Sequence, residues 1–424
     1  MHKILPTLLE EFKYKMSNFS GGVKREVAFP DIENKIFVAI GMRRVGKTYF
    51  LFQKIAELLK TVPLSRILYI NFEDDRLLPI DQEKLRNLID AFYTLHPENH
   101  DNQCYLFLDE IQNVENWHEV IRRYFDTKNV KIYLTGSSAK LLSKEIATSL
   151  RGRSIATEIW PFSLNESMQM KQNKEYFELR DLPVIGKMNF DKLNACLNTF
   201  LEEGGFPETV SFKTEERNKV LQEYVSVVIF RDIVERYHIT NISLVRYLIK
   251  TIMKNVGGSL STNKLYHDLK SQGFKIGKMT VYDYLDYITD AYLGFRVPLY
   301  SESLRKTESN PKKIYAIDTG LIKAYSSGIS PNTGHHFENL IFLDLKRKGH
   351  EVYYYLTRSR REIDFISKDL HGKWHMYQVC LDITNSDTYE REILAMKEAE
   401  EELGLIGKLI TPNTYFEDWI APDK

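Results

Sequence analysis

The sequence has few cysteines, no excess of either charge and no long hydrophobic run. Its three cysteines, Cys104, Cys196 and Cys380, are far apart and odd in number, which fits neither a disulfide framework nor a zinc knuckle. Lys plus Arg equals Asp plus Glu at 58 each, so no overall charge attracts the chain to nucleic acid or to an anionic membrane. No stretch approaches the ~20 apolar residues of a membrane helix or a signal-like run. We therefore expect a soluble cytoplasmic protein with no membrane contact.

The length of 424 residues exceeds one ordinary core, so two or three domains are the starting expectation. Strand-like and helical runs alternate between residues 35 and 138, which predicts an α/β fold with a mostly parallel sheet. Residues 161–245 are expected to be helical. Residues 246–330 contain helix signals followed by two strand-like pieces. Residues 331–424 give a helix, three strands and a closing helix.

The segment GMRRVGKT at 41–48 matches the P-loop pattern and lies between an apolar strand and a helix. Its glycines let backbone N–H groups close around phosphates, Lys47 reaches the outer phosphates of ATP, and Thr48 offers a hydroxyl to Mg²⁺. Arg43 and Arg44 are tolerated if their side chains point outward, because the cradle uses backbone atoms. The residues expected to bind the nucleotide are Gly41, Arg44, Val45, Gly46, Lys47 and Thr48.

Polar residues end two later candidate strands. CYLFLDE places Asp109 as a direct or indirect partner of the magnesium ion and Glu110 as the base that activates water. Acidic residues also end many ordinary strands, but the sequence distance between the P-loop and this pair fits one or two intervening strand–helix units. In LTGSS, Thr135 or Ser137 is a candidate for holding the attacking water or the terminal phosphate, with a helix cap as the alternative.

These motifs resemble the AAA-type ATPases, in which the acidic pair and a polar sensor lie on adjacent central strands. The resemblance implies an arginine supplied by a neighbouring subunit, and therefore a homo-oligomer. TSLRGRS offers Arg151 and Arg153 at the corresponding place, and we assign the catalytic arginine to Arg153. A pair of ordinary surface arginines is the alternative.

Residues 246–330 have the helix and strand order of a winged helix. On a helical projection, residues 281–292 place three carboxylates, Asp283, Asp286 and Asp290, on the face opposite the apolar one. Such a helix would oppose phosphate, so we expect a protein contact or a scaffold role in preference to DNA reading. The expected buried residues of this helix are Val281, Leu285, Ile288 and Tyr292.

The tail resembles the restriction-endonuclease-like fold, with Glu338 on a helix and Asp364 on a strand. Gln378 and Cys380 stand where working members carry Glu and Lys. Gln brings no charge to a metal and Cys brings no cation, so we expect the fold without nuclease activity. Together with Glu362, the two acidic residues leave a partial metal site as an alternative to ordinary surface carboxylates.

A basic stretch at 346–361 is the best candidate for a DNA contact, because its charges flank a tyrosine-rich strand. A solvated rim beside an edge strand is the alternative. The basic residues are Lys346, Arg347, Lys348, Arg358, Arg360 and Arg361.

From about residue 33 to residue 415, the chain resembles a large family of bacterial and archaeal ATPases whose tail is a domain of unknown function, number 4143. The resemblance implies ATP binding with Mg²⁺, and we expect hydrolysis to move the C-terminal modules. Two alternatives stay open: a slow nucleotide switch that gates a protein partner, and an ATP-dependent nuclease. The expected domains are an AAA-like ATPase domain at 1–160, a helical lid at 161–245, a winged-helix-like domain at 246–330 and a nuclease-like domain at 331–424.

Overall fold

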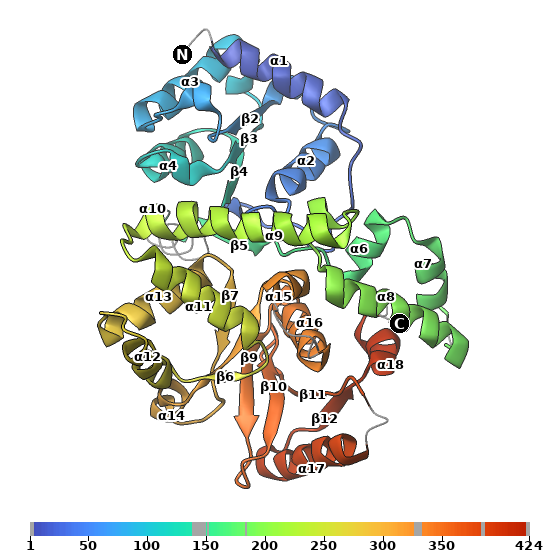
Figure 1. Ribbon diagram of the computed structural model, residues 1–424. Helices are drawn as coiled ribbons and strands as arrows, with labels where there is room; N and C mark the ends of the chain where they lie inside the picture. Colours follow the sequence, from blue (N-terminus) through green and yellow to red (C-terminus); the bar gives the residue numbers. More distant parts are fainter. Residues whose placement is uncertain are drawn as a thin grey trace. The chain divides into compact units, whose positions relative to one another are not determined.

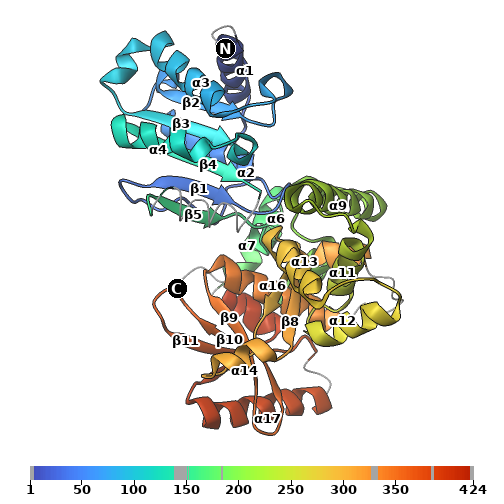
Figure 2. The same ribbon diagram turned by 90° about the vertical axis from the view of Figure 1, so that its left-hand side faces the viewer.

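The chain folds into two compact units, Met1–Trp160 and Pro161–Lys424 (Figures 1 and 2). The structure is a computed structural model, and it describes residues 4–137, 150, 152–182, 185–325, 333–382 and 386–420. Within these ranges, no helix has both the length and the apolar character needed to cross a bilayer.

The first unit is built on a five-stranded parallel sheet with the strand order β2-β3-β4-β1-β5. The α/β class and the parallel sheet are confirmed. Every strand expected between residues 35 and 138 is present, and β5 is an additional strand at the edge beside β1. The elements are α1 (Ile4–Ser17), β1 (Ile36–Ile40), α2 (Lys47–Leu58), β2 (Ile67–Asn71), α3 (Gln82–Leu95), β3 (Cys104–Asp109), α4 (Trp117–Thr127), β4 (Val130–Gly136) and β5 (Ser154–Glu158).

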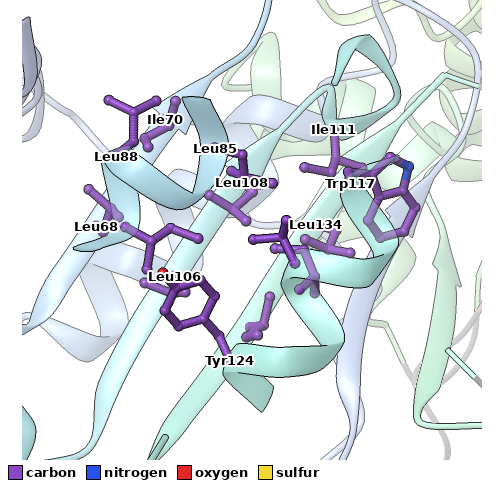
Figure 3. Packing of buried hydrophobic residues seen from close by; sticks show 14 of the residues in the cluster. Leu68, Ile70, Leu85, Leu88, Leu106, Leu108, Ile111, Trp117, Tyr124 and Leu134 are labelled. Atoms are coloured by element: carbon purple, nitrogen blue, oxygen red, sulfur yellow. The ribbon is translucent and has the colours of Figure 1, made fainter. Parts of the chain in front are cut away.

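Both faces of this sheet are apolar, as a sheet covered by crossover helices requires. Because side chains alternate along a strand, Leu106 and Leu108 of β3 point to the face that α3 and α4 cover (Figure 3). Tyr105 and Phe107 point to the opposite face, which α2 covers. Phe107 stacks there on Tyr133 of β4 with ring centroids 4.6 Å apart. Each fully buried side chain of this size stabilises the fold by roughly 1.5–3 kcal/mol.

The second unit begins with helices and continues into a small antiparallel sheet with the order β6-β8-β7. The helical content of 161–245 is as expected, and α9 runs on through a π-helical turn at Ile229–Val234. The elements are α6 (Leu164–Met170), α7 (Lys174–Arg180), α8 (Lys187–Glu203), α9 (Thr214–Val228), α10 (Glu235–Tyr237), α11 (Ile242–Lys254), β6 (Ser259–Leu260), α12 (Thr262–Ser271), α13 (Lys278–Asp290), β7 (Gly294–Val297), α14 (Leu304–Ser309) and β8 (Lys312–Ala316).

The α13 helix buries the apolar face that its periodicity predicts. Val281, Leu285 and Ile288 are buried, as is Tyr284, which the projection left out. Tyr292 is buried as well, although it follows the end of the helix. On the other face, Asp286 forms an ion pair with Arg296 of β7, so one of the three carboxylates already has a cationic partner.

The chain ends in a four-stranded sheet with the order β12-β11-β10-β9. Strand β10 runs antiparallel to β9 and β11, whereas β12 is parallel to β11. The α17 helix packs on this sheet through a small apolar cluster that includes Ile363, Ile366 and Ala399. The elements are α15 (Thr319–Tyr325), α16 (Thr333–Arg347), β9 (Glu351–Leu356), β10 (Glu362–Lys368), β11 (Trp374–Val379), α17 (Ser386–Leu403), β12 (Gly407–Ile410) and α18 (Pro412–Thr414).

The two sheets of the second unit are connected by backbone hydrogen bonds. Tyr300 N donates to Tyr354 O at 2.7 Å, and Tyr354 N donates to Pro298 O at 3.1 Å. These bonds attach the segment after β7 to β9, an edge strand of the four-stranded sheet. The small sheet and the terminal sheet are therefore held together by the main chain.

Candidate nucleotide-binding site

The loop between β1 and α2 approaches the backbone of a neighbouring segment so closely that its first glycine is required. A Cβ on Gly41 would lie 2.2 Å from the carbonyl oxygen of Ile159, and the glycine has φ +153°. Gly46 precedes α2 with φ 96° and no side-chain cap. The first N–H groups of α2 therefore have no intrahelical partner and are oriented for an anion.

Gly41→Ala is expected to weaken ATP binding by about 5- to 150-fold, because relieving this overlap and strain costs roughly 1–3 kcal/mol in the loop. Calorimetric titration with ATP measures the loss of affinity, and a thermal melt measures the loss of stability. Gly186→Ala is the matched control, since Gly186 has φ −76° and nothing near its missing Cβ. Equal ATP affinity for the two variants would contradict a phosphate-binding role for this loop.

The two arginines inside the loop do not enter the cradle. Arg44 is exposed, with φ 69°. Arg43 turns to Glu73, with its guanidinium 2.5 Å from the carboxylate. Behind the loop, Arg25 donates to the carbonyls of Val45 at 2.9 Å and Trp160 at 2.6 Å. These contacts stabilise the loop from outside, so the arginines are compatible with a phosphate site.

Asp109 ends β3 on the face that α2 covers, because it alternates in step with Phe107. Its Oδ2 accepts hydrogen bonds from the Thr48 hydroxyl at 2.7 Å and the Tyr69 hydroxyl at 2.9 Å. Its Oδ1 accepts from the Thr135 hydroxyl. Burial, and then the charge of Glu110, raise the pKa of Asp109, while these three hydrogen bonds oppose the rise. The carboxylate is thus fixed beside the Thr48 hydroxyl.

Glu110 faces Lys47 at the same end of the sheet. The Lys47 ammonium lies 3.5 Å from Glu110 Oε1 and donates to the carbonyls of Gly41 and Met42, each at 3.1 Å. Burial raises the pKa of Glu110, but the Lys47 charge and a hydrogen bond from Gln112 outweigh burial and lower it. Glu110 is therefore a carboxylate at neutral pH and can accept a proton.

Thr135 lies between the two acidic residues. Its hydroxyl donates to Asp109 and accepts from the backbone N–H of Glu110 at 2.8 Å. This contact orients the acidic pair, and a direct contact of Thr135 with water or phosphate stays a prediction. Ser137, the alternative in the same motif, is 1% exposed and lies 3.4 Å from Gln112 Nε2.

Arg153 is not near the other site residues of its own chain. It directly precedes β5, and its carbonyl accepts from Ile36 N at the start of β1. The P-loop follows the opposite end of β1, roughly 16 Å away at 3.3 Å per residue. The side chain pairs instead with Asp126 at 2.9 Å. Arg151, the other candidate, lies outside the described residues.

The tail residues compared with a nuclease centre come close together, but not in a catalytic arrangement. Both polar ends of the Gln378 side chain are engaged within the protein: its Oε1 accepts from Asp364 N at 3.2 Å and its Nε2 donates to Glu392. Burial raises the pKa of the Cys380 thiol, so this residue supplies no charge in the place of a lysine. Glu338 and Asp364 both contact Lys313.

The basic stretch at 346–361 forms two groups at opposite ends of β9, roughly 20 Å apart. In the first group, Arg347 bonds Asp344 at 2.7 Å and Lys348 lies over the Trp419 ring at 4.3 Å. In the second group, Arg361 pairs with Glu398 at 3.3 Å. Several of these charges therefore already serve the fold, and they do not form one continuous patch.

Three contributors to the site were missed from the sequence: Tyr69, Gln112 and Arg25. Tyr69 lies in an apolar strand and resembles an ordinary core residue, and Arg25 lies in a stretch with no recognisable motif. Gln112 follows the acidic pair by two residues. Its proximity to Glu110 was the one available signal.

Comparison with known proteins agrees with this geometry. A family model described as an AAA domain matches residues 33–168, and a second, described as a domain of unknown function (DUF8612), matches residues 195–333. Neither model reaches the tail beyond residue 333, so the family number 4143 expected there stays a prediction. Among solved structures, the Aeropyrum pernix ORC1 protein in complex with DNA is 12% identical, with 76% of this chain and 91% of that chain covered. Its TM-score of 0.29 is too low to support an inference.

The parallel sheet, the loop before α2 and the acidic pair define a P-loop protein of the AAA type. The uncharacterized protein MJ1544 of Methanocaldococcus jannaschii is 37% identical over 414 residues, covering 95% of this chain and 88% of that protein. An uncharacterized protein of Haemophilus influenzae is 27% identical, with 88% and 89% covered. The chain belongs to the same family as the Methanocaldococcus protein.

Proposed function

We propose that the chain binds and hydrolyses ATP with Mg²⁺. The observation that carries this proposal is the pairing of the P-loop with the acidic residues of β3: Thr48 is bonded to Asp109, and Lys47 is paired with Glu110. A phosphate-binding loop, a hydroxyl, a carboxylate and a base are thus assembled at one end of the sheet. In this assignment Gly41, Arg44, Val45 and Gly46 surround the phosphates with their main chain.

The residues fit a magnesium ion. Hydroxyl and carboxylate oxygens are ligands that Mg²⁺ accepts, usually with several waters and phosphate oxygens. Thr48 and Asp109 would hold the ion directly or through water, and the ion would neutralise charge on the phosphates. Tyr69 and Thr135 keep the Asp109 carboxylate in position for this role.

Glu110 is the proposed base. The lowered pKa keeps this buried side chain ionised, and the ionised form is the one that can accept a proton from a water molecule as that water attacks the terminal phosphate. Thr135 positions the backbone of Glu110, and Gln112 holds its side chain. Because Arg153 lies at the far end of the sheet in its own chain, we propose that it acts on the site of a second copy, in a homo-oligomer.

We propose that nucleotide state is coupled to movement of the C-terminal parts. These parts are a helical lid at 161–245, a winged-helix-like domain at 246–330 and a nuclease-like domain at 331–424, the last belonging to the family numbered 4143. Backbone bonds connect the last two, so we expect them to move together. The acidic α13 and the divided basic residues favour a protein partner over DNA, and a DNA contact would use Arg358 and Arg360. Free thiols at all three cysteines support a cytoplasmic location.

Isothermal titration calorimetry of the full chain with a non-hydrolysable ATP analogue and millimolar Mg²⁺ tests the proposal. We expect one nucleotide per chain. Light scattering on the same samples tests whether assembly depends on nucleotide, as an arginine supplied by a second copy requires. Folded protein that takes up neither ATP nor the analogue would overturn the proposed function.

A further inference from the structure

A buried lysine in the second unit is surrounded by carboxylates. Lys313 of β8 is 1% exposed, and its ammonium lies 2.7 Å from Glu338 Oε1, 2.9 Å from Glu362 Oε1 and 3.1 Å from Asp364 Oδ1. Glu338 comes from α16, and the two other carboxylates come from β10. Three segments of the chain therefore converge on one cation.

The strand geometry explains the convergence. Glu362 and Asp364 are two residues apart and face the same side of β10. The pairing of β10 with β9 shifts register between Ile363 and Ile366, and a bulge of this kind redirects side chains. Ile363 and Ile366, on either side of the shift, both pack in the apolar cluster with α17, whereas Glu362 and Asp364 contact Lys313.

The ammonium donates hydrogen bonds to Glu338 and Asp364 and forms an additional ion pair with Glu362. A lysine ammonium has three donors and no acceptor, and two donors of Lys313 are used in hydrogen bonds to Glu338 and Asp364. Burial opposes the charge on Lys313, but Glu338, Tyr315 and the other carboxylates raise its pKa well above the usual value. Tyr315 also donates its hydroxyl to Glu338 Oε1 at 2.7 Å. The lysine is a fixed charge and not a reactive amine.

The cluster contains more negative than positive charge. Three acidic residues surround one ammonium, and two carboxylates still outweigh it if Glu338, whose pKa is raised by burial to about 7, is protonated. Oxygen ligands of this kind suit hard divalent cations such as Mg²⁺, whose oxygen ligands lie at about 2.0–2.1 Å. The spacing around Lys313 is longer and suits an ammonium, and within the described ranges these side chains do not form a metal-binding group as they stand.

We propose that Lys313 is the resident cation of a carboxylate cage, and that the cage binds a hard divalent ion such as Mn²⁺ or Mg²⁺ only when this ammonium is removed. The lysine holds β8 against α16 and β10 in the position that such an ion would take. The tail therefore needs no metal for its fold, and the carboxylates are not available to activate water. This inference is independent of ATP binding at the first unit.

Lys313→Met in the full chain tests the proposal, with Mn²⁺ binding followed by electron paramagnetic resonance without nucleotide. We expect this variant to bind one more Mn²⁺ per chain than the wild type does. The dissociation constant of the additional site is expected to be below about 1 mM. Lys312→Met is the matched control, because Lys312 is the neighbouring residue of β8 and bonds Thr307 O at 2.6 Å instead. The gain is expected to disappear when Asp364→Asn is added.

Folding provides a second measurement. If Lys313→Met loses its cooperative unfolding transition, Mn²⁺ or Mg²⁺ is expected to restore it and K⁺ is not, since only the divalent ions neutralise the cage. A variant that binds no additional Mn²⁺ and is not restored by divalent ions would overturn the proposal. So would a wild-type protein whose own Mn²⁺ site disappears on Asp364→Asn.

Discussion

Lys47→Ala is expected to abolish ATP binding at micromolar to low millimolar ATP. The Lys47 ammonium is 5% exposed and lies among the carbonyls of the loop and the carboxylate of Glu110. We expect this ammonium to contact the outer phosphates. Hydrogen bonds to charged groups contribute about 1.5–3 kcal/mol each, so the loss of two such bonds weakens binding at least about 100-fold. Calorimetric titration of the full chain measures the loss.

The control for this variant is Lys54→Ala on the same helix. Lys54 pairs with Glu57 at 3.0 Å on the surface of α2, and an exposed pair of this kind contributes little. Lys54→Ala is expected to bind ATP as the wild type does. If Lys47→Ala kept its affinity while remaining folded, the phosphates would not lie at the start of α2.

Much of the first unit is predictable because its signals are local. Apolar runs of five to seven residues give β1 to β4, and the helix Gln82–Leu95 has the bounds that its sequence indicates. The α1 helix and β5 were not predicted, and for β5 the reason is physical. The Ser154–Glu158 strand is polar at several positions and is fixed by pairing with β1, a contact that no local pattern reports.

The core of the site could also be predicted, but its supporting contacts could not. Lys47 with Thr48 and Asp109 with Glu110 belong to two short motifs, and the structure brings the two motifs together as expected, while the roles of the four residues stay predictions. The bond from Tyr69 to Asp109 depends on the register of β2 beside β3, which sequence spacing does not give. The position of Arg153 likewise depends on where β5 enters the sheet.

In the second unit, the contacts of Lys313 could not be predicted from the sequence either. The sequence placed Glu338 and Asp364 in a common nuclease-like arrangement, and the structure brings them together. The partner that decides their chemistry comes from β8, which belongs to the other sheet of the unit. A lysine in a short strand before the tail carries no local sign that it will be buried among three acids.

Glu110→Gln is expected to retain ATP binding and to lose turnover by about 10²–10⁴-fold, the usual contribution of a positioned general base. The glutamine keeps the shape and the contact with Gln112 but cannot accept a proton. It also removes the negative charge that holds Lys47, so we expect ATP affinity to be equal to or higher than that of the wild type. Single-turnover phosphate release and calorimetry separate the two effects.

The matched control is Glu57→Gln, an exposed carboxylate on α2, which is expected to leave both quantities unchanged. The combination of lost turnover and kept affinity is diagnostic, because a variant that merely distorted the loop would lose both. Normal hydrolysis by Glu110→Gln would remove the base from this position. Weaker binding by this variant would instead mean that the Lys47–Glu110 pair organises the loop for ATP and does not compete with the phosphates for the ammonium.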